Sequence, residues 1–173
     1  MKRKDPPRRP NSQLLPTLFD RLRDDAPHQQ AENADAYTVT RSQMSEIVRR
    51  DLAHLLNTTN REDEIDRERH AYAARSTVNY GVPPLAGTHA ADRDWPEILG
   101  MIRRAIEDFE PRLIPGDLVV RLLDKKPTEH EYNVLRFEIR GRVHMNPYPM
   151  AFTAQSSLDL ETRSISIKSF QAS

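Results

Sequence analysis

Residues 95–123 read WPEILGMIRRAIEDF followed by EPRLIPGDLVVRLL, a helical pattern that gives way to a strand pattern. The first part repeats apolar side chains at the spacing of a core-facing helix, at Ile98, Met101, Ile102, Ala105, Ile106 and Phe109. Pro96 is tolerated in the first turn, whereas Pro111 pushes Glu110 out of helical geometry. We therefore predict a helix over 95–109 and a buried strand over 118–123.

The sequence after Gly116 is typical of strands separated by turns. Residues 133–144 alternate apolar and charged side chains, as expected of a half-buried strand. The alternation continues over 150–156 and 165–169, after turns at 146–149 and 161–163. The pattern predicts an α+β fold, an antiparallel β-meander packed on one face by two or three amphipathic helices.

Two further helices are predicted on the N-terminal side. Residues 42–56 place six apolar side chains on one stripe, and Thr40 and Gln43 have the spacing of a capping box. A shorter amphipathic helix is expected around 14–22. The segment 60–69 is almost entirely polar, and we interpret it as a solvated loop or helical turn.

The composition of the two ends of the chain differs. Residues 1–13 contain three prolines and five basic side chains with one apolar residue, so they cannot bury enough surface to offset ordering entropy. We expect a flexible basic, proline-rich arm over 1–13 and a single domain over 14–173. A chain of 173 residues has the usual size of one domain.

The overall charge and the cysteine count narrow the possible partners. Lys plus Arg and Asp plus Glu both number 26, so no global field favours nucleic acid or an anionic membrane. There is no cysteine, and no stretch approaches the ~20 apolar residues of a membrane span. We expect a cytoplasmic protein that binds other proteins, without nucleic acid and without membrane insertion.

Four short motifs occur in an order that resembles a known family. They are Leu18-Phe19-Asp20-Arg21-Leu22, Arg50-Asp51-Leu52 with Leu55-Leu56-Asn57-Thr58, Asn79-Tyr80-Gly81-Val82-Pro83, and Phe109-Glu110-Pro111-Arg112-Leu113. Together they resemble the TssE family of bacterial type VI secretion, which is similar to the wedge subunit of contractile phage baseplates. The resemblance spans about 14–170.

The resemblance implies a structural role in the bacterial cytoplasm. TssE joins the TssF, TssG and TssK subunits in baseplate wedges, beneath the inner-membrane complex and under the first ring of the contractile TssB/TssC sheath. On that basis the chain would anchor and initiate the sheath by strand pairing. The edge strands of a meander, with unpaired amides and carbonyls, can template such a partner.

The residues Glu110, Pro111 and Arg112 are the candidate protein-interface site. Glu110 and Arg112 flank the rigid Pro111 at a helix end, and Arg112 can make bidentate contacts to a carboxylate. The resemblance implies that they contact neighbouring baseplate or sheath subunits. The alternative is an internal brace, in which Arg112 caps the preceding helix and pairs with Glu110.

Two other functions compete with the structural role. One is a peptidoglycan-cleaving, lysozyme-like enzyme, for which Glu107, Asp108 and Glu110 are candidate carboxyl groups. Glu107 and Asp108 lie off the apolar stripe and are expected to be solvated, while Arg112 favours an ionised Glu110, the opposite of a general acid. The other is an adaptor in another contractile assembly. No phosphate loop, nucleophile elbow or His pair is visible, so we expect no enzymatic activity, cofactor or metal.

Overall fold

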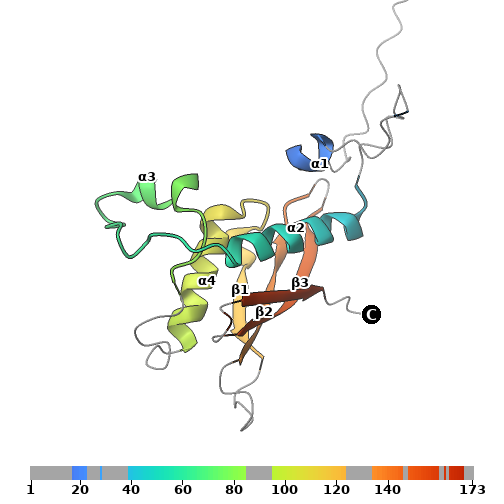
Figure 1. Cartoon of the computed structure of the whole chain (residues 1–173). Coiled ribbons are helices and arrows are strands. Elements are labelled where there is room, and N and C mark those ends of the chain that lie inside the picture. Colours follow the sequence, from blue (N-terminus) through green and yellow to red (C-terminus); the bar gives the residue numbers. More distant parts are fainter. Residues whose placement is uncertain are drawn as a thin grey trace, which may run out of the picture.

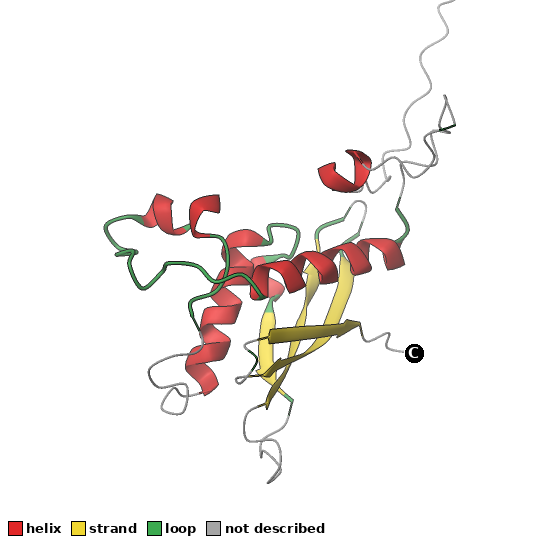
Figure 2. Ribbon diagram, in the orientation of Figure 1, coloured by secondary structure: helices red, strands yellow, loops and turns green. Residues whose placement is uncertain are grey.

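The computed structural model of the chain describes residues 17–22, 28, 39–84, 95–123, 134–145, 148–159, 162 and 164–169. The predicted arm over 1–13 lies outside these residues, as do positions 14–16 of the first expected helix. Figure 1 shows a sheet with helices packed against it, and Figure 2 separates these elements from the loops by colour.

Four strands form one antiparallel sheet in the order β1-β2-β3-β4. They are β1 (Val119–Leu122), β2 (Val134–Val143), β3 (Met150–Asp159) and β4 (Ser164–Ser169). β2 and β3 pair over their whole length, from Val134 opposite Asp159 to Val143 opposite Met150. The predicted meander is confirmed, with β1 slightly shorter than the expected 118–123.

The two long helices are α2 (Arg41–Leu56) and α4 (Trp95–Phe109). The expected capping box is present, because the Gln43 N–H donates to Thr40 Oγ1 (3.2 Å) and the Thr40 N–H donates to Gln43 Oε1 (2.8 Å). The α4 bounds match the predicted helix. α2 crosses the sheet near β3 and β4, and α4 packs beside β1 (Figure 1).

One core joins the helices to the inner face of the sheet. Alternate residues of each strand point to this face, where they meet the buried stripes of α2 and α4. Its largest fully buried side chains include Leu52, Leu55, Ile98, Ile102, Ile106, Phe137, Ile139 and Leu158. The α+β fold with helices on one face of the meander is therefore confirmed.

The remaining elements are short. They are α1 (Leu18–Leu22), α3 (Ala71–Ala74) and the 3₁₀ turns Thr77–Asn79 and Pro115–Asp117. In α1 the apolar side chains of Leu18, Phe19 and Leu22 are largely exposed, so they add nothing to the core. No helix in the described part of the chain is both long and apolar enough to cross a bilayer.

Candidate functional site

Residues from three of the sequence motifs meet in a continuous chain of ion pairs, which we call the junction. It consists of Asp20, Arg50, Asp51, Arg112 and Glu110, in that order of contact. Asp20 lies in α1, Arg50 and Asp51 lie in the middle of α2, and the last two follow α4. The junction thus connects three helices that are far apart in the sequence.

The α1 end of the junction is a two-pronged contact between Asp20 and Arg50. Arg50 Nη1 donates to Asp20 Oδ1 (2.6 Å) and Nη2 donates to Oδ2 (3.2 Å). Hydrogen bonds from Arg50 and from Thr17 lower the pKa of Asp20 from 3.8 to about 2. This ion pair attaches α1 to α2. The attachment matters because α1 has only five residues and no buried apolar stripe of its own.

The centre of the junction is Asp51, whose two oxygens bind different arginines. Oδ1 accepts from Arg50 Nη2 (2.9 Å) and Nε (3.0 Å), and Oδ2 accepts from Arg112 Nη2 (2.7 Å). Arg50 and Asp51 are adjacent in sequence, so one turn of α2 supplies both a cation to α1 and an anion to Arg112. Hydrogen bonds to the two acids raise the pKa of Arg50 above its ordinary value.

The α4 end of the junction is the buried pair of Glu110 and Arg112. Arg112 Nε donates to Glu110 Oε1 (2.6 Å), and the Arg112 backbone N–H donates to the same oxygen (3.2 Å). Glu110 is 4% exposed, so its charge depends on this partner. Burial acts to lower the pKa of Arg112, but its bonds to Glu110 and Asp51 raise it overall.

The remaining sequence motif, Asn79-Tyr80-Gly81-Val82-Pro83, borders the junction through Tyr80. Its ring meets Phe109 edge to face, with ring centroids 5.4 Å apart. Burial raises the pKa of Tyr80, and the negative charges of Asp51 and Glu110 raise it further. All four motifs quoted from the sequence therefore converge on one region of the fold.

Gly81 explains why the loop after Tyr80 has its sequence. Its φ is 129°, and a Cβ there would lie 2.3 Å from the carbonyl oxygen of Thr58. The close approach lets the Val82 N–H donate to that oxygen (2.9 Å). Asn79, 1% exposed, fixes the preceding turn by donating to the Ala74 carbonyl (3.0 Å).

A second ion cluster contradicts one of the sequence expectations. The Asp108 side chain is only 8% exposed and binds Arg67 (2.9 Å) and Arg75 (3.3 Å). Arg67 also donates to Glu62 (2.8 Å). The prediction that Asp108 and the polar segment 60–69 are solvated was wrong for Asp108, because Arg67 of that segment and Arg75 beyond it both bind Asp108 on α4.

The structure gives the three predicted interface residues different environments. Glu110 is buried, Pro111 is exposed, and the Arg112 side chain is 28% exposed. Glu110 and Arg112 pair with each other, as in the internal brace, but Arg112 also binds Asp51 of α2, where a cap on the preceding helix was predicted; the interface role stays a prediction. Sequence reasoning missed Asp20, Arg50 and Asp51 as members of the junction, although all three lie in quoted motifs; of these, Asp51 is the one that binds Arg112. In the described residues, no group of three His, Asp or Glu side chains could hold a metal ion.

The fold is that of a small α+β protein, and the junction links motif residues from three helical regions by ion pairs. A family model described as Baseplate wedge protein gp25 matches residues 42–148, more than half of the chain. The chain therefore belongs to this family of baseplate structural proteins, which is also the family of TssE. Three of the four motifs lie inside the matched span. No curated protein and no solved structure matches the chain.

Proposed function

We propose that the protein is the wedge subunit of a bacterial type VI secretion baseplate, that it is not an enzyme, and that it initiates the contractile sheath. It would act in the cytoplasm with TssF, TssG and TssK as wedge neighbours and with TssB/TssC as the sheath. Membership of the baseplate wedge family supports this role, as does the order of the four motifs. The observation that carries the sheath contact is the difference between the two edges of the sheet.

The outer edge of β4 is occupied by side chains of α2 and of its C-cap residue, Asn57. Asn57 Nδ2 donates to the Ile165 carbonyl (2.8 Å), and the Ile165 N–H donates to Asn57 Oδ1 (2.8 Å). Arg49 Nη1 donates to the Ile167 carbonyl (2.9 Å). These contacts satisfy the groups that an added strand would need, so β4 is a poor template for a partner.

The outer edge of β1 has no such cover in the described part of the chain. The Leu123 N–H donates to the Arg136 carbonyl (3.0 Å), so alternate residues back along β1 bond inward to β2. Val120 and Leu122 consequently direct their N–H and C=O groups outward. β1 is therefore the edge to which we assign an added sheath strand.

The test removes one outward donor from β1. Val120→Pro deletes the outward N–H without breaking a bond to β2, since proline is tolerated on edge strands. We expect the variant to retain TssF and TssG in affinity purification from the native cell and to lose TssB/TssC. Val119→Ala, which changes the same strand but keeps every amide, should retain all of these partners.

Two outcomes would overturn the proposal in different ways. If the sheath proteins co-purify equally well with Val120→Pro, and if this variant melts within about 5 °C of wild type, β1 is not the contact. Purification of the wild-type chain with subunits of a different contractile machine would favour the adaptor alternative.

The peptidoglycan-cleaving alternative is addressed by the carboxyl groups themselves. Glu110 and Asp108 are both engaged with arginines of the same chain, whereas a glycosidase needs a pair of carboxyl groups that face the scissile bond of the sugar. We expect no turnover when the purified chain is incubated with peptidoglycan. Release of glycan fragments with an acid-dependent rate would restore the enzyme hypothesis.

A further inference from the structure

The short helix α1 carries a group of exposed apolar side chains. Seven large apolar side chains are exposed in the described part of the chain, and three of them, Leu18, Phe19 and Leu22, belong to this five-residue helix. Their exposed fractions are 67%, 84% and 71%. The spacing i, i+1 and i+4 places all three on one side of a helix, which we call the α1 face. Apolar groups gathered on a surface mark contact sites, whereas single exposed ones do not.

Polar contacts fix α1 in the orientation that exposes this face. Thr17 caps the helix, because its Oγ1 accepts from the Asp20 N–H (3.3 Å). On the side of the helix opposite the α1 face, Asp20 accepts two bonds from Arg50 of α2. A helix held by burial places its apolar side inward and its charges outward. α1 does the reverse, so the α1 face adds nothing to the fold and is free to contact another molecule.

The flanking segments of the same chain lack the side chains that could cover the α1 face. Residues 23–38 contain no Leu, Ile, Val, Met, Phe or Trp, and their one aromatic residue is Tyr37. Residues 1–13 contain a single apolar residue. Leu14 and Leu15 continue the apolar spacing of α1 in the sequence, so they extend the pattern. Cover for the α1 face is therefore expected from a different molecule.

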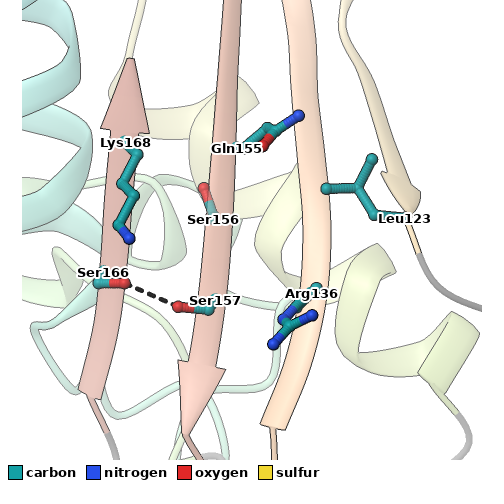
Figure 3. A pocket seen from close by; sticks show the side chains of 7 residues that line it. All are labelled: Leu123, Arg136, Gln155, Ser156, Ser157, Ser166 and Lys168. Carbon is teal, nitrogen blue, oxygen red and sulfur yellow. Dashed lines mark hydrogen bonds between the residues drawn. The ribbon is translucent and has the colours of Figure 1, made fainter. Parts of the chain in front are cut away.

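A second copy of the chain is a poor receptor for this face. One aromatic side chain buries about 150–250 Å², so the α1 face supplies roughly 400 Å², about half of what each partner buries in a stable complex. A hollow of about 270 Å³ on the sheet face opposite the helices is lined by six polar side chains and Leu123. Figure 3 shows the hydroxyls of Ser157 and Ser166 joined there by a hydrogen bond of 2.7 Å. Such a polar lining does not suit an apolar helix face.

We propose that the α1 face docks into an apolar groove between helices of a neighbouring protein. Amphipathic helices bind such grooves through apolar anchors at helical spacing, and Leu18, Phe19 and Leu22 supply these anchors. Because Arg50 already holds the helix in place, docking loses less conformational entropy than the binding of a free peptide would. The contact is separate from the strand pairing proposed for β1 and does not depend on it.

The residues around α1 favour a protein groove over a lipid surface. Helices that lie in a membrane interface bury an apolar face over several turns and carry Lys and Arg on the polar side. α1 has five residues, and Asp20 on its polar side is bound to Arg50. Asp24 and Asp25 follow shortly after in the sequence, and anionic headgroups repel carboxylates.

The test replaces Phe19 of the full chain with the photo-crosslinking amino acid p-benzoylphenylalanine in the native cell. We expect a cross-link to an apolar helical segment of another protein, and mass spectrometry of the cross-linked peptides identifies that segment. The same amino acid at position 61 is the control, because the side chain of Arg61 is 78% exposed and lies outside the α1 face. We expect no defined cross-link from that position.

Two double variants test whether the anchors cause the cross-link from position 19. Leu18→Ser, Leu22→Ser should lower its yield at least about fivefold. The isolated variant should melt within about 3 °C of wild type, because exposed side chains contribute little to stability. The matched control Tyr72→Ser, Val78→Ser removes two apolar side chains that are 96% and 91% exposed outside α1, and it should keep the cross-link.

The proposal fails if position 19 cross-links no more than position 61, or if both double variants give equal yields. Cross-links to a second copy of the chain would assign the α1 face to self-association. Cross-links to lipid would assign it to a membrane surface. Either result would overturn the protein groove as its partner.

Discussion

The molecule buries two glutamates in opposite ways. At the junction, Glu110 is 4% exposed and depends on Arg112, which it shares with Asp51. On the face of the sheet opposite the helices, which we call the outer face, Glu138 is 3% exposed and pairs with both Arg121 and Arg140. The junction thus has three carboxylates against two guanidiniums. The cluster of Glu138, Arg121 and Arg140 has one carboxylate against two guanidiniums. The two glutamates are similarly buried, yet the junction carries an excess of negative charge and the Glu138 cluster carries an excess of positive charge.

The largest expected effect is at the junction, because Glu110 has a single arginine. Arg112→Met would leave a buried carboxylate without its cation, which we expect to cost about 3 kcal/mol. Chemical denaturation of the purified chain measures this loss. The matched control is Arg103→Met, whose exposed pair with Glu107 on α4 should contribute less than about 0.5 kcal/mol.

This measurement also separates the two interpretations of the Glu110-Pro111-Arg112 motif. If Arg112→Met melts like the wild type but fails to join a baseplate, the interface role accounts for the motif and the brace does not. If stability falls as expected, Arg112 is a structural brace. The exposed Pro111 then remains available to contact a neighbour.

The outer face should behave differently because its arginines are redundant. Arg121→Leu and Arg140→Leu each leave Glu138 with one guanidinium and should cost about 0.5–1 kcal/mol. The double variant leaves the buried carboxylate unpaired, and we expect a loss of about 3 kcal/mol, more than the sum of the single effects. A double-mutant cycle by denaturation measures this coupling. Simple additivity would contradict the shared-carboxylate interpretation.

The parts of the fold that the sequence could predict are those with local periodicity. The stripe from Ile98 to Phe109 and the alternation across β2 and β3 each record one buried face. The capping box of Thr40 and Gln43 is local too. Such signals need only a few neighbouring residues, which is why the bounds of α4 and β2 were accurate to one position, although β3 extends three residues beyond the predicted 150–156.

The charged contacts could not be predicted because they join distant segments. Asp108 lies off the α4 stripe, and only folding brings Arg67 and Arg75 over it. Glu138 occupies an outward position in β2, where alternation predicts exposure, yet two arginines cover it. A single sequence gives residue type and spacing but not which cation reaches which carboxylate.

A smaller effect is expected at Ser156, whose buried hydroxyl oxygen has no hydrogen-bond partner among the residues that the structure describes. Both buried glutamates are satisfied, so Ser156 tests what burial costs without a partner. Ser156→Ala should raise the free energy of unfolding by up to about 1 kcal/mol. Ser157→Ala, which removes a hydroxyl bonded to Ser166, should not stabilise the protein. A loss of stability in Ser156→Ala would mean that the hydroxyl is satisfied in solution.

The smallest effect concerns the exposed end of the junction, where Asp20 ties α1 to Arg50. The pKa of Asp20 is lowered from 3.8 to about 2, so its contribution is complete above pH about 4. It is lost as the pH falls from about 4 through 2, when protonation removes the charge that Arg50 binds. Because Arg50 is 42% exposed, the global free energy should change by less than about 0.5 kcal/mol.

The readout for Asp20 is therefore local. NMR signals of the α1 amides should shift with a midpoint near pH 2, while those of α4 do not follow that titration. Asp20→Asn should give the detached α1 spectrum at every pH. A midpoint near pH 4 would mean that Asp20 is unpaired in solution. In that case α1 would not be part of the junction, and Asp51 and Glu110 would share Arg50 and Arg112 as two balanced pairs.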